Sequence, residues 1–332
     1  MPFSMQYFWQ RTDKKTLTNW KGRLFIMNKY YHGVIPPIIT PIDKNENVDE
    51  NGFRTLLNHC VEHGLHGIFV AGSNGETMAL TQEQRDNAIR IAISEVGSKV
   101  PVMCGVMDTS TRRVIENIKR LEAMGGTCAV ITSIFYARHT SQDETIRLFE
   151  EVSRNTQCDL MVYNIPMFTN MKLTADTILR IAKIDKVVGV KDSSGDFGEF
   201  QKILRVYADN QNFSCLQGST AISAAAILEG ADGYVPSIAP LFPELFVQMY
   251  EYAKEKNILK TLELDAIIAE TQKILGMSKN ATASNKYALS LLGFTDKKVI
   301  APQDCIALEE EKNILRKVEE IRNLLKIKGI IQ

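Results

Sequence analysis

Eight short apolar or β-branched runs recur along this chain, and enough residues separate neighbouring runs for one helix between each pair. The runs are residues 33–40, 67–72, 100–106, 128–132, 159–163, 187–191, 214–218 and 233–236. Apolar runs that alternate with stretches of helical spacing are typical of βα units with a parallel sheet. Eight such units predict an α/β fold, a closed (β/α)8 barrel of the TIM type.

Two helix starts support this count. Thr81 with Gln84, and Ser141 with Glu144, fit the capping box, in which each side chain satisfies a backbone amide of the first helical turn. Both pairs stand just before a stretch with helical apolar spacing, as the βα alternation requires.

The same patterns divide the chain into three parts. The barrel is predicted over residues 29–256, and residues 257–332 keep helical periodicity without a convincing strand, which predicts a C-terminal helical appendage. Residues 1–28 are basic and lack a continuous apolar segment of signal-peptide type. We expect a disordered extension there, with an organelle transit peptide, or translation beginning at Met27, as the alternatives.

Composition narrows the function classes. The 39 basic and 39 acidic residues cancel, so no global field favours nucleic acid or an anionic membrane, and a small-molecule substrate is expected. No stretch reaches the ~18 apolar residues of a membrane span. The six cysteines form no CxxC pair, which indicates a reducing, cytoplasmic location. His59 and His63 lack the HExxH order, so no metal is expected.

Catalytic residues of a barrel of this kind lie at the carboxyl ends of its strands. Three of the predicted ends carry polar or reactive residues, and they should meet over one mouth. They are Ala-Gly-Ser-Asn-Gly-Glu at 71–76, Tyr-Asn-Ile-Pro at 163–166, and Gly-Val-Lys-Asp-Ser-Ser-Gly-Asp at 189–196.

Each of these ends allows a chemical and a structural interpretation. A buried Lys191 would have a lowered pKa and could attack a ketone as a neutral amine, or it could simply pair with Asp192. Tyr163 could transfer a proton to the substrate or pack as a core tyrosine. The turn at Ser73 could hold a carboxylate through its hydroxyl and backbone amides, or could only reverse the chain.

Taken together and in this order, the segments resemble the dihydrodipicolinate synthase and N-acetylneuraminate lyase superfamily of class I aldolases. The resemblance covers roughly residues 33–297 and includes Val-Ile-Pro-Pro-Ile-Ile-Thr-Pro at 34–41. It also includes Gly-Ser-Asn-Gly-Glu at 72–76 and the spacing between Tyr163 and Lys191.

The resemblance implies roles for individual residues. Lys191 would form an iminium with pyruvate, Tyr163 would shuttle protons, and neither a cofactor nor a metal would be needed. The substrate would be held by residues of the turn and of the loop after Lys191: Ser73, Asn74, Gly75 and Ser193. Ser73 would also be catalytic, as a member of the proton relay. Tyr136 resembles a tyrosine that the family sends into a neighbouring subunit's site, which implies a homo-oligomer, a dimer or tetramer. Its segment, residues 132–136, departs from the usual proline-containing pattern.

The substrate is predicted from one position at which this sequence departs from the pattern of similar dihydrodipicolinate synthases. After Tyr-Asn-Ile-Pro the chain reads Met167-Phe168-Thr169, where similar dihydrodipicolinate synthases carry an arginine for the carboxylate of aspartate semialdehyde. We therefore expect aldol cleavage or formation of a 2-keto-3-deoxy sugar acid or a 4-hydroxy-2-oxoglutarate-like acid. Dihydrodipicolinate synthase is the first alternative, and N-acetylneuraminate lyase is disfavoured by the residues after Lys191. A catalytically silent barrel that binds a 2-oxo acid is the alternative from another class.

Overall fold

The computed structural model describes residues 19–20, 23–24, 30–137 and 139–332. All eight predicted strands are present, in one sheet of parallel neighbours ordered β3-β10-β9-β8-β7-β6-β5-β4. Their bounds are β3 (Gly33–Val34), β4 (Ile68–Val70), β5 (Val102–Gly105), β6 (Cys128–Ile131), β7 (Asp159–Asn164), β8 (Val187–Asp192), β9 (Ser214–Gln217) and β10 (Gly233–Tyr234). The predicted (β/α)8 fold is confirmed.

The sheet closes on itself through the segment that follows β3. Ile38 N donates to Phe69 O at 2.9 Å, and Phe69 N donates to Pro36 O at 3.0 Å, so this segment pairs with β4. The first run was predicted over residues 33–40, but its regular ladder is only two residues long. Pro36 and Pro37 shorten it because proline has no N–H to donate.

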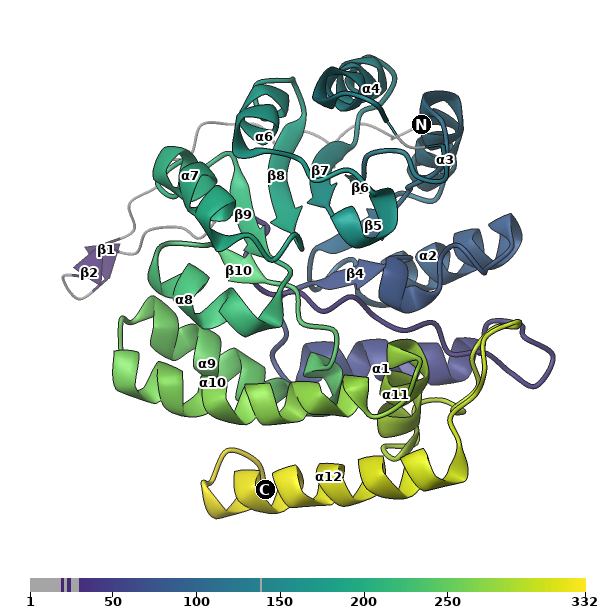
Figure 1. The fold of residues 1–332 in the computed structure, drawn as a ribbon, viewed down its shortest axis with the longest axis vertical. Helices are drawn as coiled ribbons and strands as arrows, with labels where there is room; N and C mark the ends of the chain where they lie inside the picture. Colours follow the sequence, from purple (N-terminus) through teal and green to yellow (C-terminus); the bar gives the residue numbers. More distant parts are fainter. Residues whose placement is uncertain (1–18, 21–22, 25–29, 138) are drawn as a thin grey trace.

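Helices cover the outside of the strands (Figure 1). They are α1 (Glu50–Glu62), α2 (Gln82–Val96), α3 (Thr111–Ala123), α4 (Gln142–Arg154), α6 (Ala175–Ile181), α7 (Phe197–Tyr207), α8 (Ser223–Leu228) and α9 (Pro243–Lys254), with a short α5 (Pro166–Thr169) after β7. The capping box at α2 is confirmed, because Thr81 N donates to the Gln84 side chain and Gln84 N donates to Thr81 Oγ1. At α4, Ser141 N donates to the Glu144 carboxylate.

The strands are buried on both faces. Phe69, Met103, Val130 and Met161 belong to an apolar cluster inside the barrel, whereas the alternate strand residues pack with the helices in a larger outer cluster. This two-sided burial explains why the strands appear in the sequence as nearly continuous apolar runs. It also fixes which residues at the strand ends point into the mouth.

Three further helices follow the barrel: α10 (Ile258–Gln272), α11 (Ala281–Ser290) and α12 (Leu308–Ile327). In Figure 1, α12 lies on the far side of α10 from the strands, at the yellow end of the chain. Helix α11 contacts the turn η3 (Ala239–Leu241), which follows the last strand. The C-terminal helical region therefore reaches the barrel itself.

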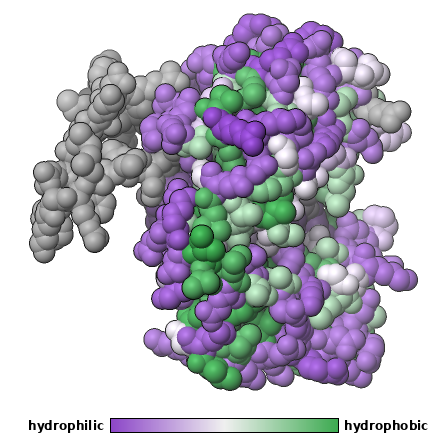
Figure 2. Space-filling view, turned by 60° about the vertical axis from the view of Figure 1, so that its left-hand side comes forward, coloured by the Kyte–Doolittle hydropathy of each residue, from purple (hydrophilic) through white to green (hydrophobic). Residues whose placement is uncertain are grey.

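The side of the molecule turned forward in Figure 2 shows a band of hydrophobic residues between hydrophilic ones. Helix α10 begins on this side in Figure 1, and its Ile258, Leu259 and Leu262 are exposed. Apolar surface of this kind is often covered by another chain. No helix in the described part of the chain is long and apolar enough to cross a membrane.

The expected disordered extension, residues 1–28, lies almost wholly outside the described residues. Within it, β1 (Asn19–Trp20) and β2 (Arg23–Leu24) pair as antiparallel strands.

Candidate active site

Lys191 and Tyr163 lie side by side at the carboxyl ends of β8 and β7, where their Cα atoms are register partners. Lys191 Nζ is 3.9 Å from the centroid of the Tyr163 ring and 4.6 Å from that of Phe69. Both Lys191 and Tyr163 are buried. Gly189 allows β8 to pack here, because a Cβ at that position would lie 2.5 Å from Ser214 O.

Lys191 is buried without an acidic partner. No carboxylate among the described residues lies within ion-pair distance of its ammonium nitrogen, Asp192 included. Burial lowers the pKa of Lys191, and the neighbouring Tyr163 opposes that shift. A lysine in such surroundings loses its proton more readily than an exposed one, and the neutral amine is the form that attacks a carbonyl carbon.

The carboxylate of Asp192 accepts hydrogen bonds that hold the loops around Lys191 in place. It accepts them from Asn164 Nδ2 at 2.7 Å and from Ser194 N and Oγ at 3.0 and 2.7 Å. Asn164 Oδ1 in turn accepts from Leu173 N at 3.0 Å. Burial raises the pKa of Asp192, and these donors oppose the rise. Asp192 therefore does not pair with Lys191, which was the structural alternative considered from the sequence. It belongs instead to a hydrogen-bond network that fixes the loop after β8.

Ser193 lies close to Lys191. A Cβ added to Gly218 would lie 2.0 Å from Ser193 Oγ and 3.2 Å from Lys191 Cε, so both side chains approach the same glycine. Glycine is therefore required at the end of β9 to leave room for them. The backbone N–H of Ser193 donates to Asn164 O at 2.8 Å, which ties the loop to β7.

The turn that follows β4 is the short helix η1 (Ser73–Gly75). The start of this turn and Lys191 both lie against the ring of Phe69. A Cβ on Gly72 would lie 2.8 Å from Phe69 Cε1, and Lys191 Nζ lies over the same ring. Asn74 Nδ2 donates to Pro37 O at 2.6 Å, and Thr40 Oγ1 donates to Gly75 O at 2.8 Å. The turn is thus held against the segment that closes the barrel.

Tyr136 is not part of this cluster. In this chain it lies in the loop between β6 and α4, 95% exposed, with a φ of 69°. A left-handed conformation is uncommon for a bulky side chain and points to a functional or packing constraint. The structure thus brings together Lys191, Tyr163, Ser193 and the turn, and it leaves Tyr136 on the surface.

Four further polar residues lie at or behind this mouth and were not identified from the sequence. Glu76, at the end of the turn, forms a fully buried ion pair with Lys286 of α11, and Asn285 Nδ2 donates to Asn74 Oδ1 at 3.2 Å. The sequence of α11 mixes apolar residues with Thr, Ser and Asn, so it gave no clear signal that Lys286 is buried.

Thr132, one residue beyond β6, is the fourth. It is buried, and its hydroxyl has no hydrogen-bond partner among the residues that the structure describes. Its neighbour Ser133 faces α4, where its Oγ lies 3.1 Å from Thr145 Oγ1. Because strand residues alternate between faces, Thr132 points into the barrel, level with Tyr163.

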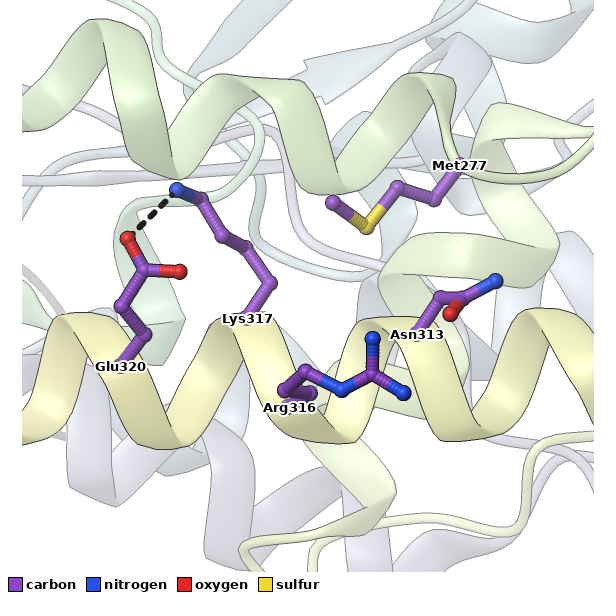
Figure 3. A pocket seen from close by; sticks show the side chains of 5 residues that line it. All are labelled: Met277, Asn313, Arg316, Lys317 and Glu320. Carbon is purple, nitrogen blue, oxygen red and sulfur yellow. Dashed lines mark hydrogen bonds and ion pairs between the residues drawn. The ribbon is translucent and has the colours of Figure 1, made fainter.

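A surface pocket of about 360 Å³ lies elsewhere, between Met277 and α12, and is lined by Met277, Asn313, Arg316, Lys317 and Glu320 (Figure 3). Lys317 pairs with Glu320 there and, outside the lining, with Glu270. None of these residues contacts the cluster around Lys191, so the pocket and the predicted site are separate.

The two histidines considered for metal binding contact other groups. His63 Nδ1 lies 2.6 Å from the Glu244 carboxylate, and His59 Nε2 lies 3.1 Å from Pro240 O. His59 therefore links α1 to η3, and His63, which follows α1, contacts the first turn of α9. Within the described ranges, no group of three or more His, Cys, Asp or Glu side chains could hold a metal ion.

Comparisons with known proteins identify the family to which the chain belongs. The family model described as the dihydrodipicolinate synthetase family matches residues 30–321. An uncharacterized DapA-like lyase of Halobacterium salinarum is 30% identical over 263 residues, which is 79% of this chain and 85% of that protein. A 4-hydroxy-tetrahydrodipicolinate synthase of Methanopyrus kandleri is 29% identical over 287 residues, 86% of this chain and 94% of the relative.

A solved structure gives the same result. The dihydrodipicolinate synthase of Bacteroides thetaiotaomicron superimposes with a TM-score of 0.83 at 30% identity, covering 89% of this chain and 100% of that one. The resemblance inferred from the motifs is therefore confirmed. The chain belongs to the dihydrodipicolinate synthetase family and is an enzyme of the lyase class.

Proposed function

We propose that this enzyme forms a Schiff base between Lys191 and the ketone carbon of pyruvate, and that it makes or breaks a carbon–carbon bond to an aldehyde. The supporting observation is the burial of Lys191 without a carboxylate, against the Tyr163 ring. The neutral amine attacks the ketone, and the ketone oxygen leaves as water. The resulting iminium withdraws electrons from the adjacent carbon, so a proton or an aldehyde can leave that carbon as the enamine forms.

Tyr163 is the proposed proton carrier for these steps. Its side chain lies beside Lys191 Nζ, at the point where the ketone oxygen must gain protons before it leaves. General acid–base catalysis by a positioned side chain contributes roughly 10²–10⁴-fold. Replacement of Tyr163 by Phe removes the phenolic proton while keeping the ring.

The turn Ser73–Gly75, with Ser193, is proposed to bind the carboxylate of the 2-oxo acid. Gly75 N donates to Gly72 O at 3.0 Å, whereas the N–H groups of Ser73 and Asn74 donate to no backbone oxygen in the described part of the chain. The Asn74 side chain already binds Pro37 and Asn285. Asn74 would therefore contribute its backbone N–H, and Ser73 its N–H and hydroxyl.

The proposal for the aldehyde partner rests on the apolar side chains of the short helix α5. Met167 and Phe168 are exposed after Tyr163, and neither can pair with a second carboxylate. This favours a 2-keto-3-deoxy sugar acid or a 4-hydroxy-2-oxoglutarate-like acid. The alternative, 4-hydroxy-tetrahydrodipicolinate synthase, is favoured by the names of the relatives, which are 25–31% identical to this chain.

We also propose that the enzyme is a homo-oligomer in which Tyr136 enters the site of a neighbouring copy. The almost complete exposure of this tyrosine in a single chain supports the proposal.

Borohydride reduction with pyruvate, followed by intact mass and peptide mapping, tests the Schiff base. We expect an adduct at Lys191 in the native enzyme, none in Lys191→Ala, and an undiminished adduct in Lys202→Ala, which replaces an exposed lysine. The absence of an adduct from the native enzyme would favour the silent barrel. With an adduct in hand, cleavage of 2-keto-3-deoxy sugar acids compared with condensation with aspartate semialdehyde decides the substrate.

A further inference from the structure

The carboxylate-binding turn proposed above is held from outside the barrel. Glu76 ends the turn in a left-handed conformation, with a φ of 55°. One oxygen of its carboxylate accepts a hydrogen bond from Ile300 N at 2.9 Å, and the other pairs with the ammonium group of Lys286. Both side chains of that ion pair are shielded from solvent, with exposures of 1% and 0%. The partners of Glu76 thus belong to the C-terminal region.

A second contact reaches the middle of the turn. Asn285 is fully buried on α11, and its Nδ2 donates to Asn74 Oδ1 at 3.2 Å and to Ser237 O at 3.1 Å. Ser237 lies in the loop after β10. The Asn285 side-chain amide, on α11, therefore links the turn after β4 to the loop after β10. Asn285 and Lys286 are adjacent in sequence and hold adjacent parts of the turn.

This arrangement is costly if its purpose is stability alone. A buried ion pair commonly stabilises a fold no better than apolar residues of the same volume. Asn285 Oδ1 is, in addition, buried without a hydrogen-bond partner among the described residues, and burying an unpaired polar atom lowers stability. Directional contacts are instead suited to fixing how the backbone N–H groups of Ser73 and Asn74 point.

We infer that Asn285 and Lys286 are positioning residues for the substrate carboxylate, so that the C-terminal helical region is a working part of the active site. The inference rests on the proposed function, because it takes the turn to bind a carboxylate. Neither residue touches the reacting atoms. Their loss should weaken the recognition of a carboxylate-bearing ketone and spare the reactivity of Lys191.

Two ketones separate these effects in the borohydride assay. Pyruvate carries the carboxylate, and acetone does not, so the ratio of their adduct-forming efficiencies measures carboxylate recognition. In Asn285→Ala we expect this ratio to fall about tenfold, because the half-saturating pyruvate concentration rises while acetone trapping stays unchanged. Ser290→Ala is the matched control, since it removes one hydrogen bond from the same helix, to Tyr287 O, away from the turn.

The ion pair has its own test. Glu76→Met combined with Lys286→Met removes both charges and keeps the volume filled, so folding should be retained, and circular dichroism checks this. We expect the same selective loss of pyruvate trapping in this double variant. Equal losses with both ketones, or an unchanged ratio in folded Asn285→Ala and in the double variant, would overturn the inference. Failure of the native enzyme to trap either ketone would instead refute the proposed function.

Discussion

Two lysines are buried in the described part of the chain, Lys191 at the barrel mouth and Lys286 on α11, and they differ in what surrounds the charge. Lys286 is completely buried and pairs with Glu76, whereas Lys191 is 3% exposed and faces the rings of Tyr163 and Phe69. Burial lowers the pKa of both, and Glu76 opposes this for Lys286 where only Tyr163 does so for Lys191. A full counter-charge keeps a buried lysine protonated, so the missing carboxylate distinguishes Lys191, the proposed nucleophile, from Lys286.

The difference between the two lysines should be largest in the free energy of unfolding. Lys286→Met leaves the Glu76 carboxylate buried and unpaired, and we expect it to cost about 3–5 kcal/mol of unfolding free energy. Lys191→Met should leave stability unchanged or higher, because a flexible apolar side chain replaces a buried amine that has no ionic partner. Urea denaturation measures both. The double variant Glu76→Met/Lys286→Met should recover most of the loss.

A similar loss of stability in both single variants would break the comparison. It would mean that the surroundings of Lys191 stabilise a charge as well as Glu76 does, and Lys191 would then be an ordinary buried cation.

The pH dependence of adduct formation sharpens the comparison at Lys191. Only the neutral amine attacks the ketone, so the rate of trapping should rise about tenfold per pH unit while Lys191 is mostly protonated. Because burial lowers the pKa of Lys191 from 10.5, the rate should level off at a pH below 10.5. Initial rates at pyruvate concentrations well below half-saturation, with fixed reductant, give the profile for the free enzyme. A rate that still climbs through pH 10.5 would contradict the lowered pKa.

Much of this fold could be predicted from the sequence because parallel barrel strands are buried on both faces and appear as short apolar runs. The run at 33–40 shows the limit, since Pro36 and Pro37 look apolar but cannot continue the ladder. The contact between Lys191 and Tyr163 could also be predicted, because residues that end neighbouring parallel strands lie side by side.

The contribution of α11 to the site could not be predicted in the same way. Asn285 meets Asn74 across 211 residues of sequence, and helical periodicity does not say against which surface a helix packs. Lys286 would ordinarily be assigned to a solvated face, since lysine is rarely buried unless paired, and its partner Glu76 is almost as distant in sequence. Tyr136 is different again, because the contact that we propose for it, with a neighbouring copy, cannot be seen within a single chain.

The smallest expected effect concerns the Phe69 ring. Lys191 Nζ lies 4.6 Å from its centroid, and an aromatic face stabilises an ammonium group over it by about 0.5–1 kcal/mol at exposed sites and about 2 kcal/mol at desolvated ones. Phe69→Leu removes this stabilisation, so it should lower the pKa of Lys191 further. The trapping profile should then level off at a correspondingly lower pH. Phe53→Leu, an equally buried ring on α1, is the control and should leave the profile in place. An upward displacement in Phe69→Leu would show that the ring acts by excluding water from Lys191 and not by favouring its charge.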